Sequence, residues 1–231
     1  MKVVVLQPSY IPWRGYFHQV QKADIFVFYD CVQYDADGWR NRNQIKTAQG
    51  PLWLTIPVRA KGHTTQHTAI KDVAIDPVKP WSKKHWRTLE QAYAKAPHFK
   101  RYAELLRGFY DRTDEFLADF TCDLTVALAR ELGIEHTQFV RSSTLALEGA
   151  KTDRLLGLLT QLGATHYVSG PSARSYMEEE KFATAGISLE YMHYEYPDYP
   201  QLHGAFLPQV SILDLLFNAG PEAPRHIWGQ S

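Results

Sequence analysis

Three short stretches of this sequence gather residue types that bind anions and flat ligands. The first follows an apolar run near the N-terminus, and its candidate binding residues are Gln7, Tyr10, Trp13, Arg14 and Gly15. Pro8 and Pro12 fix φ and stiffen this loop, while the glycine allows a ligand to approach the backbone closely. The amides of the helix expected after Pro12 could hold a phosphate or carboxylate, with the arginine as a second partner. A tight turn with aromatic packing is the alternative interpretation.

The second stretch, from Asp30 to Lys46, is the densest in hydrogen-bond donors. Positions 40–46 are RNRNQIK, and in an extended strand their side chains alternate between two faces. One face would carry a cationic row that could bind a phosphorylated or carboxylated ligand, and the other would offer amides to hydroxyl groups. The candidate ligand-binding residues of these two rows are Arg40, Asn41, Asn43 and Lys46. A solvated strand is the alternative.

Two residues of this second stretch are candidates for catalysis. Asp30 directly follows an apolar run, so its carboxylate could act as a general base at the end of a strand. Arg42 could stabilise the negative charge of an oxyanion or a diphosphate. A helix cap or a turn is the alternative role for the aspartate.

The third stretch follows a strand expected at 165–169. Ser169, Gly170 and Arg174 resemble an anion-binding turn. The same Ser-Gly-Pro sequence is also common in ordinary turns, so the pattern alone leaves both interpretations open.

Cysteine and charge usage argue against several classes of protein. The 231 residues include two cysteines without CxxC spacing, so neither a disulfide scaffold nor a cysteine-based zinc site is expected, and a reduced, cytoplasmic setting fits better. His63 and His67 lie four positions apart in a Gly/Thr-rich loop, so no metal site is predicted there either. Lys+Arg and Asp+Glu both number 25, which argues against a large nucleic-acid footprint. No run approaches the roughly 18 apolar residues of a membrane span.

Apolar runs and helical periodicity alternate along the chain. The runs predict strands at 3–7, 25–30, 52–58, 137–141, 165–169 and 187–194, with a weaker strand at 69–76. Helices are predicted at 12–23, 152–162 and 210–218, and three more between 81 and 132, broken near Pro97 and Asp111. This order predicts an α/β fold, a mostly parallel sheet flanked by helices, in a single domain of residues 1–231 with a helical insert at 80–132.

Ligands of such sheets bind outside the carboxyl ends of the strands, where the strand order switches. This rule points to the loops at 7–15, 30–46 and 169–176. We therefore expect the three stretches to converge on one cleft.

Four segments together resemble the WbqC-like protein family: LQPSYIPWRGYFHQVQKADIFVFYDCVQY, WRNRNQIK, KTDRLLGLLTQLGATHYVSGPSARSYMEEEKFATAGISLEY and YPQLHGAFLPQVSILDLLFNAGPE. The resemblance covers nearly the whole chain. It implies a role in bacterial surface-polysaccharide pathways, including O-antigen and lipopolysaccharide assembly, where members are associated with attaching glycine or another small acyl group to an amino sugar. It implies no particular catalytic residue.

A more distant resemblance joins the first strand, the Pro-containing loop and the W-x-G-Y turn to the start of the Rossmann-like nucleotidyl-transferase superfamily. That superfamily binds the phosphates of ATP with an H-x-G-H motif, and Trp13 and Tyr16 occupy the two histidine places here. The usual imidazoles are therefore missing. Arg14, Arg40, Arg42 or Lys46 could supply the positive charge instead.

Three functions remain open at this point. The first is an acyl or aminoacyl transferase, or an amide ligase, that acts on an amino sugar carried by a nucleotide and uses ATP or an activated acyl donor. The second is a non-catalytic accessory protein that binds a ligand of the pathway. The third is an RNA- or tRNA-binding protein, and an aminoacyl-tRNA could also donate the acyl group. The sequence does not indicate an oligomeric state.

Overall fold

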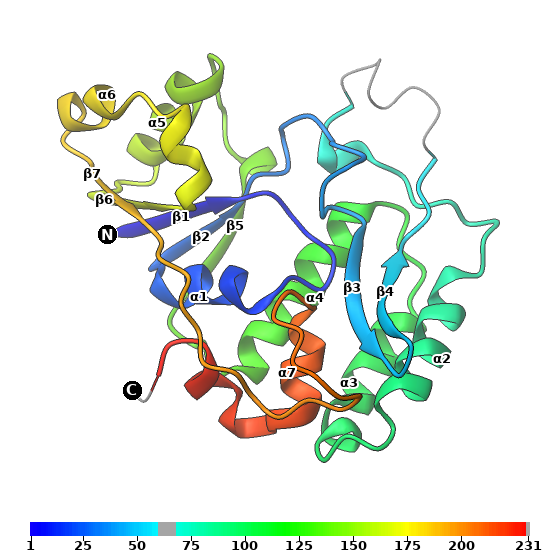
Figure 1. Ribbon diagram of the computed structural model, residues 1–231. Coiled ribbons are helices and arrows are strands. Elements are labelled where there is room, and N and C mark those ends of the chain that lie inside the picture. The colour runs from blue at the N-terminus through cyan, green and yellow to red at the C-terminus, as the bar shows by residue number, and fades with distance from the viewer. Residues whose placement is uncertain (60–67, 230–231) are drawn as a thin grey trace.

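A five-stranded parallel sheet forms the centre of the molecule (Figure 1). The computed structural model describes residues 1–59 and 68–229. The strands are β1 (Lys2–Leu6), β2 (Ile25–Phe28), β5 (Gln138–Arg141), β6 (His166–Ser169) and β7 (Ser188–Tyr191). Their order is β5-β2-β1-β6-β7, and every neighbouring pair is parallel. The predicted α/β fold with a mostly parallel sheet is thus confirmed.

Helices cover both faces of this sheet, because side chains alternate in direction along each strand. Val4, Phe26 and Phe28 point into one cluster with α1 (Arg14–Lys22) and α4 (Leu117–Glu131). The alternate positions, such as Val3 and Val27, pack in a second cluster against α5 (Lys151–Gln161) and α6 (Glu179–Thr184). Figure 1 shows these two helical layers on opposite sides of the strands.

The helices between positions 81 and 132 follow the expected pattern. They are α2 (Trp81–Tyr93), α3 (Phe99–Tyr110) and α4, and the chain breaks between them close to Pro97 and at Asp111. The final helix is α7 (Ile212–Ala219), which Ser211 caps by accepting a hydrogen bond from the amide of Leu213. Short 3-10 turns lie at Ile70–Asp72, Ser142–Thr144, Pro171–Ser175 and Gly220–His226.

The strand predicted at 52–58 is formed, but it does not join the parallel sheet. Its residues instead form β4 (Gly50–Thr55), which pairs antiparallel with β3 (Arg42–Thr47) in a separate two-stranded hairpin (Figure 1). Gly50 has φ 104, which suits the tight return of the chain before Pro51. Only one face of the hairpin is covered, since Leu54 is buried whereas Trp53 is 42% exposed. An apolar run does not by itself show which sheet a strand joins.

The weaker strand expected at 69–76 is not formed as a continuous strand. The segment is a 3-10 turn followed by isolated bridges, in which Ile75 pairs with Val58 and Ala74 with Phe116. Ile70 and Val73 are fully buried, so this segment serves as packing beside α4 rather than as part of a sheet.

Candidate functional site

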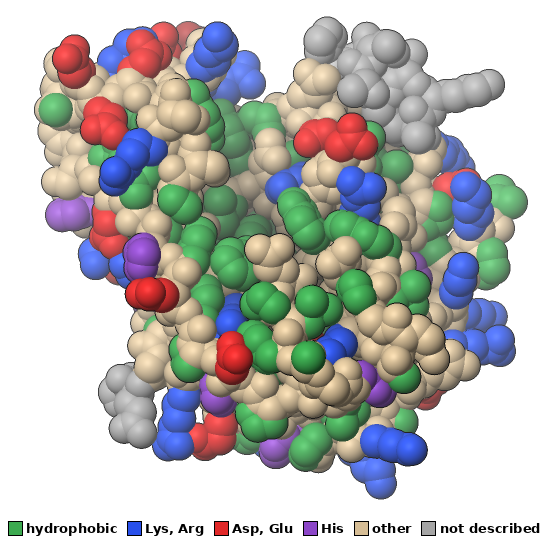
Figure 2. All heavy atoms as spheres, in the orientation of Figure 1, with side chains coloured by type: hydrophobic (Ala, Val, Ile, Leu, Met, Phe, Trp, Pro, Cys, Tyr) green, Lys and Arg blue, Asp and Glu red, His purple; other side chains and the backbone are tan. Residues whose placement is uncertain are grey.

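A cavity of about 1180 Å³ lies at the carboxyl edge of the parallel sheet. The ends of β1 and β2 form its floor, and the start of α5 and the segment after β6 form one wall. Figure 2 shows a hollow on this face, between the part formed by α5 and α6 and the part that carries the loop after β2. The chain leaves β1 toward β2 on one side and returns as β6 on the other, so the cavity occupies the switch point at which α/β sheets bind ligands.

All three predicted stretches contribute to this cavity, although through few of the expected side chains. Of the predicted site residues, only Gln7 and Arg40 line it. The other polar and aromatic lining residues in these stretches or directly beside them are Ser9, Tyr16, Tyr29, Cys31, Gln33, Tyr176 and Glu178. A fourth segment, 150–155, also lines the wall and was not predicted.

The cavity lining carries more positive than negative charge. Its cations are Arg40, Lys151 and Arg154, and within the described ranges none of them pairs with a carboxylate. Its one described carboxylate is Glu178, whose Oε2 lies 3.1 Å from Nζ of Lys181. The first turn of α5 points its free amides toward the same edge, which adds to the positive potential.

Arg40 is held in place by backbone carbonyls rather than by an acid. Its Nη1 donates to the carbonyl oxygens of Gln7 at 3.1 Å and Pro8 at 3.2 Å, while its Nε is buried without a partner. Burial lowers the pKa of Arg40, and the nearby tyrosine Tyr16 partly opposes this shift. The guanidinium therefore brings a positive charge to the cavity wall, which the nearby carboxylate of Asp35 offsets only in part.

A second, smaller pocket of about 280 Å³ lies against the first. Ser9, Tyr16 and Arg40 line both hollows and form the wall that they share. On its far side, the pocket is lined by Pro12, Trp13, Trp39, Asn43 and Gln209. Three predicted site residues, Trp13, Arg40 and Asn43, therefore lie around this pocket.

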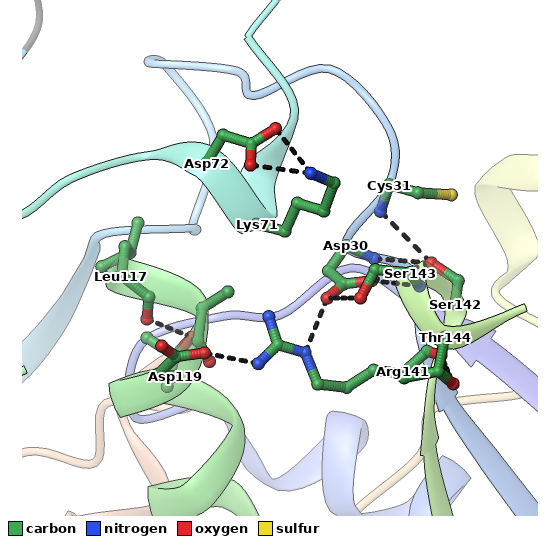
Figure 3. Close-up of polar contacts among 12 residues, drawn as sticks. Asp30, Cys31, Lys71, Asp72, Leu117, Asp119, Arg141, Ser142, Ser143 and Thr144 are labelled. Carbon is green, nitrogen blue, oxygen red and sulfur yellow. Dashed lines mark hydrogen bonds and ion pairs between the residues drawn. The ribbon is translucent and has the colours of Figure 1, made fainter. Parts of the chain in front are cut away.

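Asp30 lies beside the cavity but holds a different part of the structure (Figure 3). Its Oδ2 accepts from Arg141 Nε at 2.7 Å and Ser143 Oγ at 2.8 Å. Its Oδ1 accepts from Ser142 Oγ and the Ser143 amide, both at 2.9 Å. Arg141 also pairs with Asp119. The fully buried carboxylate thus joins the ends of β2 and β5, and none of its hydrogen bonds is directed to the cavity lining.

Arg42, the second predicted catalytic residue, packs on the outside of the hairpin. Its guanidinium donates to the carbonyl oxygens of Asp37 and Gly38 and lies 5.0 Å from the ring of Trp53. It lines neither pocket.

Tyr10 and Arg14 are buried and serve the core. The Tyr10 hydroxyl bonds to Nδ1 of His85 at 2.9 Å and to the hydroxyl of Tyr110 at 2.6 Å. Arg14 donates from Nη1 to the carbonyl oxygen of Pro197 at 2.7 Å, and it also donates to that of His226. Burial raises the pKa of Tyr10 and lowers that of Arg14. Neither side chain reaches the described cavities.

The predicted amides and lysine of the hairpin bond to neighbouring carbonyl groups. Asn43 donates from Nδ2 to the carbonyl oxygens of Tyr10 and Ile11, at 3.1 and 2.9 Å, and its Oδ1 accepts from the amide of Gln44. Asn41 donates to the carbonyl oxygen of Ile56. The contacts of Asn43 fix the hairpin to the loop after β1, and that of Asn41 joins the two ends of the hairpin.

Lys46 is covered by the segment before α7. Its Nζ donates to the carbonyl oxygens of Gly204 and Ala205 and to Oε1 of Gln201. Its charge therefore anchors that segment rather than facing either cavity.

The three residues of the predicted anion-binding turn after β6 do not line the cavity. Ser169 is buried, Gly170 begins a short 3-10 turn, and the guanidinium of Arg174 lies 4.6 Å from the ring of Tyr191. The cavity is reached by the residues that follow, Tyr176 and Glu178 among them.

Gly15 contributes through packing. A Cβ at this position would overlap the indole of Trp13, so the glycine allows the ring to lie across the start of α1. The ring is also held edge-on by Tyr194, at 5.0 Å between centroids.

The segment 150–155 is the main functional candidate that sequence reasoning missed. A signal was available, because a helix that follows a strand in a parallel sheet begins at the carboxyl edge of that sheet. Lys151, Thr152 and Arg154 could thus have been placed beside the ligand site.

In the ranges 1–59 and 68–229, no group of three or more His, Cys, Asp or Glu side chains could hold an ion. His63 and His67 lie outside the described residues. None of the described helices is long and apolar enough to cross a bilayer.

Comparison with known proteins gives a matching family model and a similar protein of nearly the same length. A model of the WbqC-like protein family matches residues 7–226. The uncharacterized protein Rv1507c of Mycobacterium tuberculosis (strain ATCC 25618 / H37Rv) is 45% identical over 228 residues, which cover 98% of this chain and 97% of the relative. No solved structure matches.

Proposed function

This chain belongs to the WbqC-like protein family, and from that premise we propose that it is an enzyme of polysaccharide biosynthesis that forms an amide on an amino sugar. The amino sugar is carried by a nucleotide. The transferred group is small, glycyl being one example. This substrate class is the one that the family resemblance implies, and the described cavity suits it in charge and size.

The observation that carries the proposal is the set of unpaired cations in the large cavity. Lys151 and Arg154 lie at the start of α5, where backbone amides also favour an anion. Arg40 adds a guanidinium held by carbonyl groups alone. Three cations around one cavity attract an anion, and a diphosphate matches both the charge and the donor types.

The size and lining of the cavity fit the rest of such a ligand. About 1180 Å³ exceeds the usual volume of a small-molecule site, so two reactants can be held together. Tyr29 and Tyr176 offer flat faces on which a nucleobase can stack. Burial raises the pKa of Tyr29 above its ordinary value, so its hydroxyl stays protonated and can donate a hydrogen bond.

The reaction joins two bound groups. The amine nitrogen of the sugar forms a bond to the carbonyl carbon of the acyl donor, the bond from that carbon to its leaving group breaks, and the leaving group keeps the electron pair. The amine gives up one proton. The donor is an acid activated beforehand, on tRNA for example, or activated with ATP.

Positioning and charge stabilisation are the roles left to the protein. Arg40, on the wall that the two pockets share, is our candidate for stabilising the oxyanion that forms on the carbonyl oxygen. Glu178 is the one carboxylate of the described lining of the large cavity, so it is our candidate for taking up the proton. Asp30 and Arg42 stay predictions as catalytic groups, since neither lines the cavity.

A calorimetric titration with nucleoside diphosphates and their amino-sugar derivatives tests the binding half of the proposal. We expect binding that Arg154→Ala weakens about tenfold or more, while Arg87→Ala, an exposed arginine on α2, changes nothing. Failure of every nucleotide sugar to bind at millimolar concentration would refute the proposal.

Mass spectrometry of reaction mixtures tests the chemical half. The expected product is the amino sugar heavier by one acyl residue, formed from activated acids, from aminoacyl-tRNA or from the free acid with ATP. Tight binding of the sugar without any such product would instead favour a non-catalytic accessory protein.

A further inference from the structure

We infer that the smaller pocket binds the pyranose ring of the sugar, outside the large cavity and across the wall that the two share. The inference rests on the proposed function only for the identity of that sugar. It would place the nucleotide and the sugar of one ligand on the two sides of Ser9, Tyr16 and Arg40.

The pocket has the form of a site for a neutral ring. Two indoles, those of Trp13 and Trp39, and the ring of Pro12 supply apolar faces, and the pyranose C–H groups can pack on such faces. The volume of about 280 Å³ admits one sugar ring and excludes a whole nucleotide.

The charge of the pocket argues against a phosphate. Arg40 is the one cation of its described lining, and Nη1 of this guanidinium already donates to the carbonyl oxygens of Gln7 and Pro8. The start of α5 and its two cations line only the large cavity. A phosphorylated group would therefore be drawn to the large cavity, which leaves the uncharged end of the ligand for the smaller pocket.

Polar selectivity in the pocket comes from two side chains. Asn43 contributes little, since both of its Nδ2 protons are donated within the protein and its Oδ1 already accepts from the Gln44 amide. Gln209 is exposed and makes no hydrogen bond with another described residue, so it can both donate to and accept from sugar hydroxyls. Ser9 Oγ makes only a long bond of 3.4 Å to the Gln7 carbonyl and is available from the shared wall.

The two indoles differ in how firmly they are held. Trp13 is fixed by Tyr194 and by the close approach that Gly15 allows. Trp39 is 44% exposed and contacts Trp53, with 5.2 Å between ring centroids. Trp53 is 42% exposed but does not line the pocket, so the pair offers a matched test.

The test uses a sugar without its nucleotide, methyl glucosaminide, observed by saturation-transfer NMR on the whole chain. We expect the wild type to bind it at millimolar concentration, Trp39→Ala to weaken binding about tenfold, and Trp39→Phe to recover most of the loss because a flat ring remains. Trp53→Ala should bind as the wild type does.

Three results would overturn the inference: no transfer to the wild type, unchanged binding by Trp39→Ala, or equal loss in Trp53→Ala. The nucleotide titration is read separately. If the glycoside binds through Trp39 while no nucleotide binds, the sugar pocket stands and the proposed function fails. If nucleotide sugars bind and Trp39→Ala leaves their affinity unchanged, the proposed function stands and the sugar pocket fails.

Discussion

Two polar regions of this protein differ in whether their side chains are bonded within the protein or face a cavity. Residues 30–46 are rich in charged and amide side chains, and the described structure shows most of these groups bonded within the protein, as with Asp30, Asn43 and Lys46. Residues 150–155 look ordinary in sequence, yet Lys151 and Arg154 line the large cavity without an acidic partner. A dense cluster of donors can therefore mark a heavily cross-linked loop as well as a ligand site.

The difference lies in where the acceptors are. The loop after β1 turns back and presents the carbonyl groups of Tyr10 and Ile11 to the hairpin, which uses up the amide of Asn43. At the start of α5 the free backbone groups of the helix are donors. Arg154 donates from Nε to the carbonyl oxygen of Gly149, but in the described structure neither it nor Lys151 pairs with a carboxylate. Changes in the first region should then reduce stability, and changes in the second should reduce binding.

The largest expected effect is on stability, from Asp30→Ala. Removing a buried carboxylate leaves Arg141, Ser142 and Ser143 without their shared acceptor, and should lower the free energy of unfolding by about 3 kcal/mol. Denaturant unfolding measures this directly. Asp119→Ala is the matched control, because that carboxylate is 44% exposed and should cost under about 1 kcal/mol.

A catalytic role for the aspartate makes the opposite prediction. In that case Asp30→Ala would fold with near-normal stability and lose only turnover. Such a result would break the distinction between the two regions.

Acid should also reduce stability, through the buried His85 on α2, which bonds to Tyr10 in the loop after β1. Burial lowers the pKa of His85 to about 4, whereas the unfolded chain has the ordinary value of about 6.5. The unfolded state therefore takes up a proton first as the pH falls, so the stability contributed by the neutral ring is complete above pH 6.5 and is lost toward pH 4. The loss should reach about 3 kcal/mol.

Urea unfolding measured from pH 7.5 to pH 4 gives the slope of the free energy of unfolding against pH. His85→Gln should flatten it, because the replacement has no proton to gain. An equally steep slope in the variant would assign the acid sensitivity to other groups.

A smaller loss of stability is expected from Asn43→Ala. The carbonyl groups of Tyr10 and Ile11 would lose a buried donor, which costs about 2 kcal/mol. The neighbouring Gln44→Ala is the control, since its half-buried side chain makes no described hydrogen bond and should change stability by under about 0.5 kcal/mol. Equal losses in both would mean that hairpin packing, rather than the amide, fixes the loop.

Much of the fold could be predicted because its signals are local. The apolar runs at 3–7 and 25–30 became β1 and β2, and the breaks near Pro97 and Asp111 separate α2, α3 and α4. The hairpin could not be predicted in the same way. Its strand β4 is as apolar as a sheet strand, and only its pairing with β3 shows that it lies outside the parallel sheet.

The location of the site followed from a general rule, whereas its residues did not. Parallel strands meet at one edge, so the stretches after β1 and β2 had to converge there. Whether a side chain faces the cavity depends on distant partners. The acceptors of Arg14, for example, lie 183 and 212 positions away along the chain, and no local pattern reveals them.

The central claim is tested most directly by measuring stability and affinity together for the double variant Lys151→Ala/Arg154→Ala. Its nucleoside-diphosphate affinity should fall about ten- to a hundredfold, while its free energy of unfolding stays within about 0.5 kcal/mol of the wild type. Unchanged affinity in a variant that folds normally would contradict the account, because the start of α5 would then not bind the diphosphate.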